Sequence, residues 1–126
     1  MNYIAGHRSV EAVLLNLNDE LAEQLLTPLA HWCAAVRRVS GLSGVPRASD
    51  DVAGESVIFC GPDAALVSDL RRQLPEKPIV VVTRHSDTLG WLDAIEAGAD
   101  DYCAAPFEDV QMKWILQSTV RQRLSS

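Results

Sequence analysis

A thiol and a histidine are the first pair of side chains in this sequence that could do chemistry. Cys60 ends the apolar run ESVIFC and stands before an expected helix start, a position where a thiolate is stabilised. His85 follows the next apolar run. A nucleophilic pair also needs a group that orients the histidine and an oxyanion hole, and the sequence supplies neither. The pattern therefore favours a thiol with no catalytic role.

Two carboxylates that follow apolar runs are the next candidates, because such groups accept phosphoryl groups or bind divalent cations. Asp63 stands directly before AALVSDLRRQL, where a helix N-cap explains it better than phosphoryl acceptance does. Asp19 follows Asn18 and could hold a divalent ion. One carboxylate with asparagine side chains would make a weak and poorly selective site.

The composition is that of a globular protein and argues against nucleic acid or membrane as a partner. The chain has 126 residues, of which 48% are hydrophobic and 22% charged, and its formal net charge is −6. A phosphate-binding surface needs clustered Lys and Arg, which this acidic balance does not favour. No apolar run approaches the roughly 20 residues that span a bilayer, and the start MNYIAGHRSV lacks the apolar centre of a signal peptide.

The cysteines and the length indicate one cytoplasmic domain. Cys33, Cys60 and Cys103 are odd in number and show no CxxC spacing, which favours reduced thiols in the core. We expect residues 1–8 to form a flexible N-terminal tail and residues 9–126 to form a single domain.

Five apolar runs alternate with helical patterns along the chain. The runs expected to be strands cover 11–17, 34–40, 55–60, 78–83 and 101–105, and the expected helices cover 20–32, 64–74, 87–98 and 107–123. The run PIVVVT shows almost no alternation between apolar and polar residues, so a strand formed by it would be apolar on both faces. Such strands are usually central in parallel sheets. With right-handed crossovers, this order predicts a doubly wound α/β sandwich of three layers.

Capping and breaking residues mark where these elements end. Asn18 or Asp19 and then Asp63 are suited to cap helix starts, and Gly98 is suited to end the helix before it. Pro28 is expected to kink or divide its helix. The segment 41–54, with three glycines and a proline, is expected to be a loop with at most one helical turn.

In such sheets the functional crevice lies at the carboxyl ends of the strands. Residues 83–107 there carry a series of motifs in register: Thr83 ends a strand, Ala97-Gly98-Ala99 ends a helix, and Asp101-Tyr102 and Pro106-Phe107 follow. Thr83 stands 15 positions before Gly98 and 22 before Ala105. In these residues and over nearly its full length, the chain resembles the receiver domain of bacterial response regulators. The resemblance implies a flavodoxin-like (βα)5 sandwich with strand order 2-1-3-4-5.

A working receiver accepts a phosphoryl group on an aspartate that ends its third strand. An acidic pair after the first strand holds Mg²⁺, and a Thr or Ser and a Lys contact the phosphoryl oxygens, so that developing negative charge is neutralised. By this resemblance, Cys60 stands at the acceptor position and Ala105 at the lysine position. The candidates for the acid pocket are Asn16, Leu17, Asn18 and Asp19, which retain at most one carboxylate.

Three further residues carry expectations from the resemblance. Thr83 and Tyr102 correspond to the switch residues and either still move or only pack. Arg84 replaces a small residue, and its guanidinium could cover the vacated pocket and pair with Asp19; the alternative is a solvated arginine. The face formed by the fourth helix, fifth strand and fifth helix often pairs receivers, and the residues that could lie on or beside it, or in the core, are Trp91, Asp100, Met112, Lys113 and Trp114.

These observations predict a degenerate receiver, or pseudo-receiver, that is not an enzyme and binds no cofactor or metal. It would act without phosphorylation, as an interaction module in two-component signalling or transcription regulation. Its partner would be another protein or a second copy, with a C-terminal effector domain in the full-length protein. Two alternatives stay open: a phosphorelay receiver with a relocated acceptor, Asp63 or Asp19, and a domain that binds a small anion or nucleotide near Arg84.

Overall fold

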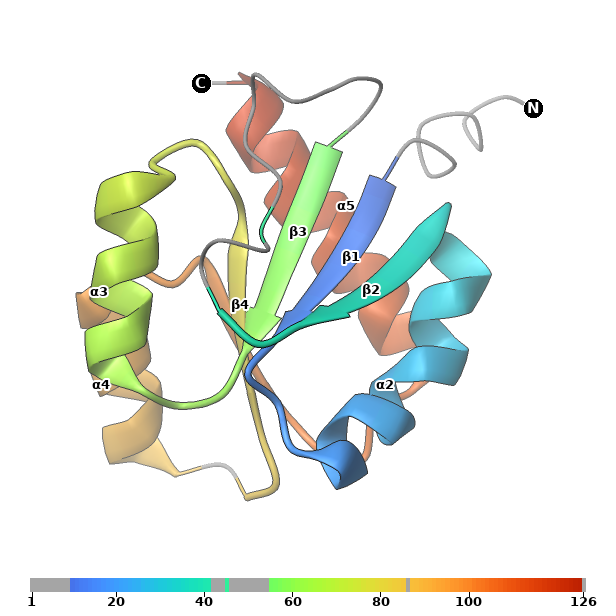
Figure 1. Cartoon of the computed structure of the whole chain (residues 1–126), viewed down its shortest axis with the longest axis horizontal. Coiled ribbons are helices and arrows are strands. Elements are labelled where there is room, and N and C mark those ends of the chain that lie inside the picture. Colours follow the sequence, from blue (N-terminus) through green and yellow to red (C-terminus); the bar gives the residue numbers. More distant parts are fainter. Residues whose placement is uncertain (1–9, 42–44, 46–54, 86, 126) are drawn as a thin grey trace.

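A single sheet of five parallel strands forms the centre of the molecule (Figure 1). The computed structural model describes residues 10–41, 45, 55–85 and 87–125. The strands lie in the order β2-β1-β3-β4-β5, which confirms the predicted flavodoxin-like topology. Their bounds are Val10–Leu15 for β1, Ala35–Val39 for β2, Glu55–Cys60 for β3, Ile79–Thr83 for β4 and Asp101–Ala104 for β5.

Two helices cover each face of the sheet (Figure 1). Helices α2 (Asp19–Trp32) and α5 (Asp109–Ser125) pack on one face, and α3 (Ala64–Gln73) and α4 (Thr88–Ala97) pack on the other. Strands β1, β3 and β4 send apolar side chains to both layers, because they are buried on both faces. None of the helices in the described part of the chain is long and apolar enough to cross a membrane.

The expected caps are present. The side chain of Asn18 accepts a hydrogen bond from the backbone N–H of Leu21, and that of Asp63 accepts one from Leu66. Gly98 ends α4 with φ of +121°, a conformation that side-chain-bearing residues rarely adopt. These residues therefore have structural roles that explain their positions.

Pro28 was expected to kink or divide its helix; α2 is continuous through this proline, so the division is wrong and the kink stays a prediction. Proline removes one N–H donor from the helix. Leu25 and Leu29 on either side of it are fully buried against the sheet, and this packing holds the two halves of the helix together. Most of the loop predicted over 41–54 and the N-terminal tail predicted over 1–8 lie outside the described residues.

Arg71 ties the amino-terminal edge of the sheet to the ends of two helices. Its guanidinium donates to the carbonyl oxygens of Pro75, Lys77 and Gly98 at 2.7–3.0 Å, and to Oδ2 of Asp100 at 2.7 Å. These bonds use all five N–H donors of the side chain. The same carboxylate oxygen accepts from the backbone N–H of Ile79 at 2.8 Å. One ion pair thus joins α3, the end of α4 and the starts of β4 and β5.

The Arg71→Ala substitution should lower the free energy of unfolding by about 3 kcal/mol or more, because the Asp100 side chain is only 6% exposed and would lose its charge partner. Arg72→Ala is the matched control, since Arg72 is 68% exposed and pairs with Asp69 on its own helix. It should change stability by about 0.5 kcal/mol or less. Urea unfolding followed by circular dichroism measures both. Equal losses in the two variants would contradict the structural role of Arg71.

Candidate functional site

The carboxyl ends of β1, β3, β4 and β5 lie side by side and bring the predicted site residues to one edge of the sheet. Leu15 pairs with Cys60 in the β1–β3 register, and Thr83 pairs with Ala104 in the β4–β5 register. The backbone N–H of Ala105 donates to the carbonyl oxygen of Thr83 at 2.9 Å. A cis peptide bond joins Ala105 to Pro106. Cys60, Thr83 and Ala105 therefore lie at the same edge of the sheet.

Cys60 lies at the end of β3 with no exposed surface. Burial raises the pKa of its thiol to about 12, and the carboxylate of Asp63 contributes further in the same direction. The thiol is therefore protonated at neutral pH and is a poor nucleophile. His85 is exposed, and its backbone N–H and carbonyl oxygen lie 3.4 and 3.3 Å from Oγ1 of Thr83.

The residues after β1 are not arranged to bind an ion. Asn16 has φ of +54°, and its backbone N–H donates to the carbonyl oxygen of Val39. Leu17 is buried, and its side chain lies 4.0 Å from where a Cβ on Gly61 would stand. Asn18 uses its side-chain oxygen to cap α2. Of the four candidates for the acid pocket, only Asp19 carries a carboxylate, and this side chain is exposed.

Asp19 is neutralised by an arginine that the sequence analysis did not consider. Nη2 of Arg38, on β2, lies 2.9 Å from Oδ1 of Asp19 and 3.1 Å from the carbonyl oxygen of Leu17. Two consecutive arginines in a strand point to opposite faces, so one of them had to reach the α2 side. That alternation was the only signal in the sequence for this contact.

Arg84 pairs with Glu20 instead of Asp19, so the predicted Arg84–Asp19 contact is wrong. Nη2 of Arg84 lies 3.5 Å from Oε1 of Glu20, and both side chains are more than half exposed. The pairing changes because Arg38 already occupies Asp19. Glu20 lies in the first turn of α2, which follows β1, and Arg84 directly follows β4. Strand β3, which ends in Cys60, lies between β1 and β4, so this ion pair spans the end of β3.

This edge does not fit Mg²⁺, the ion that working receivers hold. Mg²⁺ requires several oxygen ligands in near-octahedral geometry. The carboxylates of Asp19 and Glu20 each face an arginine, and the end of β3 presents a protonated thiol. Within the described ranges, no group of three or more His, Cys, Asp or Glu side chains is placed to hold a metal ion.

Tyr102 points toward the start of α4. Its hydroxyl lies 3.0 Å from the position that a Cβ on Gly90 would occupy, and it lines a hollow of about 590 Å³ together with Asp87, Trp91 and Gln111. Thr83 is partly buried, and its hydroxyl forms hydrogen bonds with the backbone of His85. Thr83 and Tyr102 therefore stand on neighbouring strands with separate contacts.

Three of the five residues predicted on or beside the α4–β5–α5 face do not lie on it. Met112 has no exposed surface and packs in the core between α5 and the sheet. Asp100 directs its carboxylate to Arg71 at the opposite edge of the sheet. Lys113 faces α2, with its ammonium 5.4 Å from the ring centre of Trp32. Trp91 and Trp114 are 47% and 67% exposed and remain candidates.

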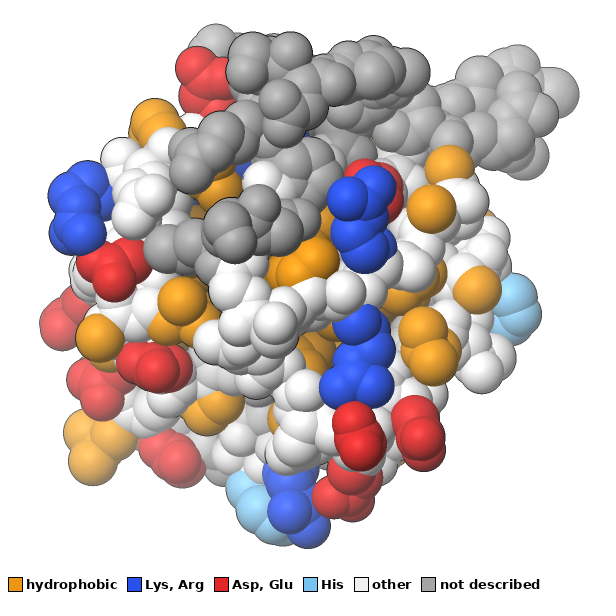
Figure 2. All heavy atoms as spheres, viewed as in Figure 1, with side chains coloured by type: hydrophobic (Ala, Val, Ile, Leu, Met, Phe, Trp, Pro, Cys, Tyr) orange, Lys and Arg blue, Asp and Glu red, His pale blue; other side chains and the backbone are white. Residues whose placement is uncertain are grey.

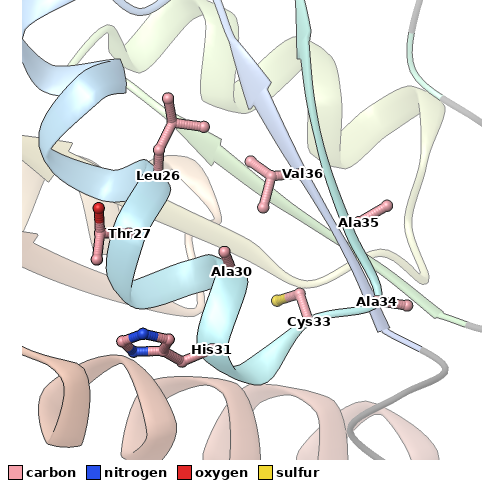
Figure 3. A pocket seen from close by; sticks show the side chains of 8 residues that line it. All are labelled: Leu26, Thr27, Ala30, His31, Cys33, Ala34, Ala35 and Val36. Atoms are coloured by element: carbon pink, nitrogen blue, oxygen red, sulfur yellow. The ribbon is translucent and has the colours of Figure 1, made fainter.

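A second hollow lies between the end of α2 and the start of β2, away from the carboxyl ends of the strands (Figure 3). It measures about 460 Å³ and is lined mainly by small and apolar side chains, among them Leu26, Ala30 and Val36. The thiol of Cys33 is directed toward it, but burial raises the pKa of that thiol to about 12. The hollow therefore offers mainly packing surface, with the imidazole of His31 at its border.

All three cysteines should resist alkylation in the folded protein, because burial raises each thiol pKa to about 12. At about pH 8 only about one thiol in ten thousand would be ionised, so iodoacetamide should react about a thousandfold more slowly than with a free cysteine. Intact mass against time measures the reaction, and the same protein in concentrated guanidinium chloride is the control. Rapid labelling of native Cys60 would contradict a buried, protonated thiol.

No protein-family model matches the chain, and no curated protein matches it in sequence. Solved structures match it in fold. NtrX from Brucella abortus superposes with a TM-score of 0.74 at 17% identity over 90% of this chain, which spans 27% of the NtrX chain. A two-component response regulator from Clostridium difficile matches with a TM-score of 0.71 at 15% identity, covering 93% of this chain and 99% of that one.

The beryllofluoride-activated NtrC4 receiver domain dimer matches with a TM-score of 0.64 at 13% identity, covering 88% of this chain and 97% of that one. The three likenesses cover nearly the whole described sheet and its helices. At such low identity they bear on architecture alone. The chain has the fold of response-regulator receiver domains.

Proposed function

We propose that this chain is a degenerate receiver domain that acts in bacterial signal transduction as a protein interaction module, without phosphorylation. The observation that carries the proposal is the buried thiol at the end of β3, whose pKa burial raises to about 12. In the receiver scheme that position belongs to an ionised aspartate. A protonated thiol forms no acyl phosphate and is no ligand for Mg²⁺.

The missing cationic group supports the same conclusion. Ala105 follows β5 beside Thr83, where a receiver would place the lysine that contacts the phosphoryl oxygens. Phosphoryl transfer depends on positioning and on neutralising the charge that develops on the transferred group. With an alanine here and no fit for Mg²⁺, little is left on this edge to stabilise such a group.

Internal ion pairs supply the charge balance instead. Arg38 faces Asp19, and Arg84 faces Glu20, so the carboxylates that would attract a metal ion already have cationic partners. These pairs are exposed and contribute little to stability individually. Because of these two ion pairs, the charges of Asp19 and Glu20 are balanced without a metal ion or a phosphoryl group. This balance suits a domain with one constitutive conformation.

The surface formed by α4, β5 and α5 is the proposed site of interaction. Trp91 on α4 and Trp114 on α5 are both substantially exposed, and aromatic anchors are enriched in interfaces. The matching NtrC4 structure is a receiver dimer, and the chain spans only 27% of NtrX, so either a second copy or an effector region is a reasonable partner. We place the domain in the cytoplasm, where its three free thiols would stay reduced.

Incubation with acetyl phosphate and Mg²⁺ should leave the intact mass of the protein unchanged, since the edge holds no ionised acceptor at the end of β3 and no lysine. A receiver with the complete residue set, treated in parallel, should gain one phosphoryl group of about 80 Da. Mass spectrometry under acidic conditions, which preserve acyl phosphates, measures both. A gain of the same mass that maps to Asp63 or Asp19 would overturn the proposal and support a relocated acceptor.

A further inference from the structure

Helix α4 carries its large apolar side chains on the outside. Leu89, Trp91, Leu92 and Ile95 are exposed by 72%, 47%, 39% and 37%, whereas the only buried residue of the helix is Ala94. A surface helix normally turns its apolar stripe to the core and its polar residues to solvent. These four residues, which we call the α4 patch, therefore form an apolar surface that the fold does not use.

The reason for the inversion is the close approach of α4 to β5. The hydroxyl of Tyr102 lies 3.0 Å from where a Cβ on Gly90 would stand, so only small residues fit on the inner side of the helix. Gly90, Ala94 and Ala97 take those positions. The large apolar residues of α4 can then lie only on the outer face or along the sides of the helix. Their exposure to water is unfavourable unless a partner covers them.

The α4 patch continues onto α5. Trp91 and Gln111 line the same hollow between α4, β5 and α5. Trp114 stands three positions after Gln111, which places it on the same side of α5, and it is 67% exposed. Val110, one turn before Trp114, is 53% exposed. The two helices thus present apolar side chains on both sides of a shallow groove.

The charged residues that border the α4 patch are acidic. Asp93 and Glu96 are exposed on α4 itself, and Asp87 caps its start. In Figure 2, acidic and hydrophobic side chains lie next to one another along the edge of the molecule formed by α3 and α4. Two basic residues close to this region in the described chain have partners elsewhere, since Arg71 binds Asp100 and Lys113 lies over Trp32.

We propose that the α4 patch binds a basic amphipathic helix of another protein. The inference rests on the proposed function, since it names the partner of the same interaction surface. Lysine or arginine side chains of such a helix would face Asp93 and Glu96, while its apolar stripe would cover Leu89 and Leu92. A second copy would instead bring two acidic borders together, which is unfavourable.

A helix is favoured over an added strand because the exposed apolar groups are side chains of helices. A peptide that extends a sheet gains its affinity from backbone hydrogen bonds along a strand edge. Here the exposed surface is made by Leu89, Leu92 and Ile95 on α4 and Trp114 on α5. An amphipathic helix with apolar residues at i, i+3, i+4 and i+7 covers such a surface by side-chain packing.

The test uses two synthetic peptides of about 18 residues with the same leucine spacing, one with lysine and one with glutamate at the other positions. Fluorescence anisotropy of the labelled peptides measures their affinity for the whole chain. The lysine peptide should bind and the glutamate peptide should not. The Asp93→Lys/Glu96→Lys variant should weaken binding of the lysine peptide by about tenfold or more, and added salt should weaken it in the wild type.

Two further variants separate the α4 patch from general attraction to an acidic protein. Glu23→Lys/Glu76→Lys makes the same change of charge at exposed positions on α2 and in the loop after α3, and it should leave binding within about twofold. Leu89→Ser/Trp114→Ser removes the most exposed large apolar residue of α4 and that of the described part of α5, and it should weaken binding about tenfold. Circular dichroism of each variant establishes that the fold is retained.

The outcomes distinguish the partner from the function. Equal losses in both charge variants, or equal binding of both peptides, would overturn the proposed partner. Sedimentation that shows a dimer of the wild type, dispersed by Leu89→Ser/Trp114→Ser, would replace the basic helix by a second copy and leave the interaction role standing. If the lysine peptide does not bind and the protein stays monomeric, the α4 patch is not an interaction surface of either kind.

Discussion

The ion pair between Arg71 and Asp100 is the interaction on which the functional half of the molecule depends. It lies at the amino-terminal edge of the sheet and fixes the starts of β4 and β5 relative to each other and to the end of α4. Because strands are stiff and paired in register, fixing their starts also fixes their other ends, where Thr83 and Ala104 stand side by side. The position of Tyr102 against α4 follows from the same constraint.

The opposite edge is organised by charge balance. Receivers in general need cationic groups and a metal ion there because a phosphoryl group brings negative charge. In this chain the arginines Arg38 and Arg84 face carboxylates from the start of α2, and a buried thiol ends the strand between the two loops. The chain has the architecture of receiver folds, and Asp19 and Glu20 at this edge are paired with arginines of the same chain.

Much of the fold could be predicted from the sequence, because each element carried a local signal. Apolar runs such as PIVVVT marked buried strands, and Asn18, Asp63 and Gly98 marked helix ends through local hydrogen bonds or backbone conformation. The prediction that Pro28 divides its helix was wrong, since tertiary packing of neighbouring leucines outweighs one lost hydrogen bond.

The residues that were misplaced depend on contacts between distant parts of the chain. Met112 and Trp114 are two positions apart, and only the packed sheet shows which of them faces the core. Arg84 was matched to Asp19 because the resemblance places both beside the same pocket, yet Arg38 on β2 occupies that carboxylate. No local pattern distinguishes these pairings, because each partner lies on a different element. The roles assigned to Cys60 and Ala105 rest on the resemblance, and their placement on one edge makes them testable.

The proposed function requires that the carboxyl edge of the sheet holds no phosphoryl group. Beryllofluoride with Mg²⁺ mimics that group, and nuclear magnetic resonance of the ¹⁵N-labelled protein reports binding at each backbone amide. The amide signals of Cys60, Thr83 and Tyr102 should stay in place throughout the titration. Saturable shifts of these signals would contradict it, because they would show that the edge still recognises the phosphoryl mimic.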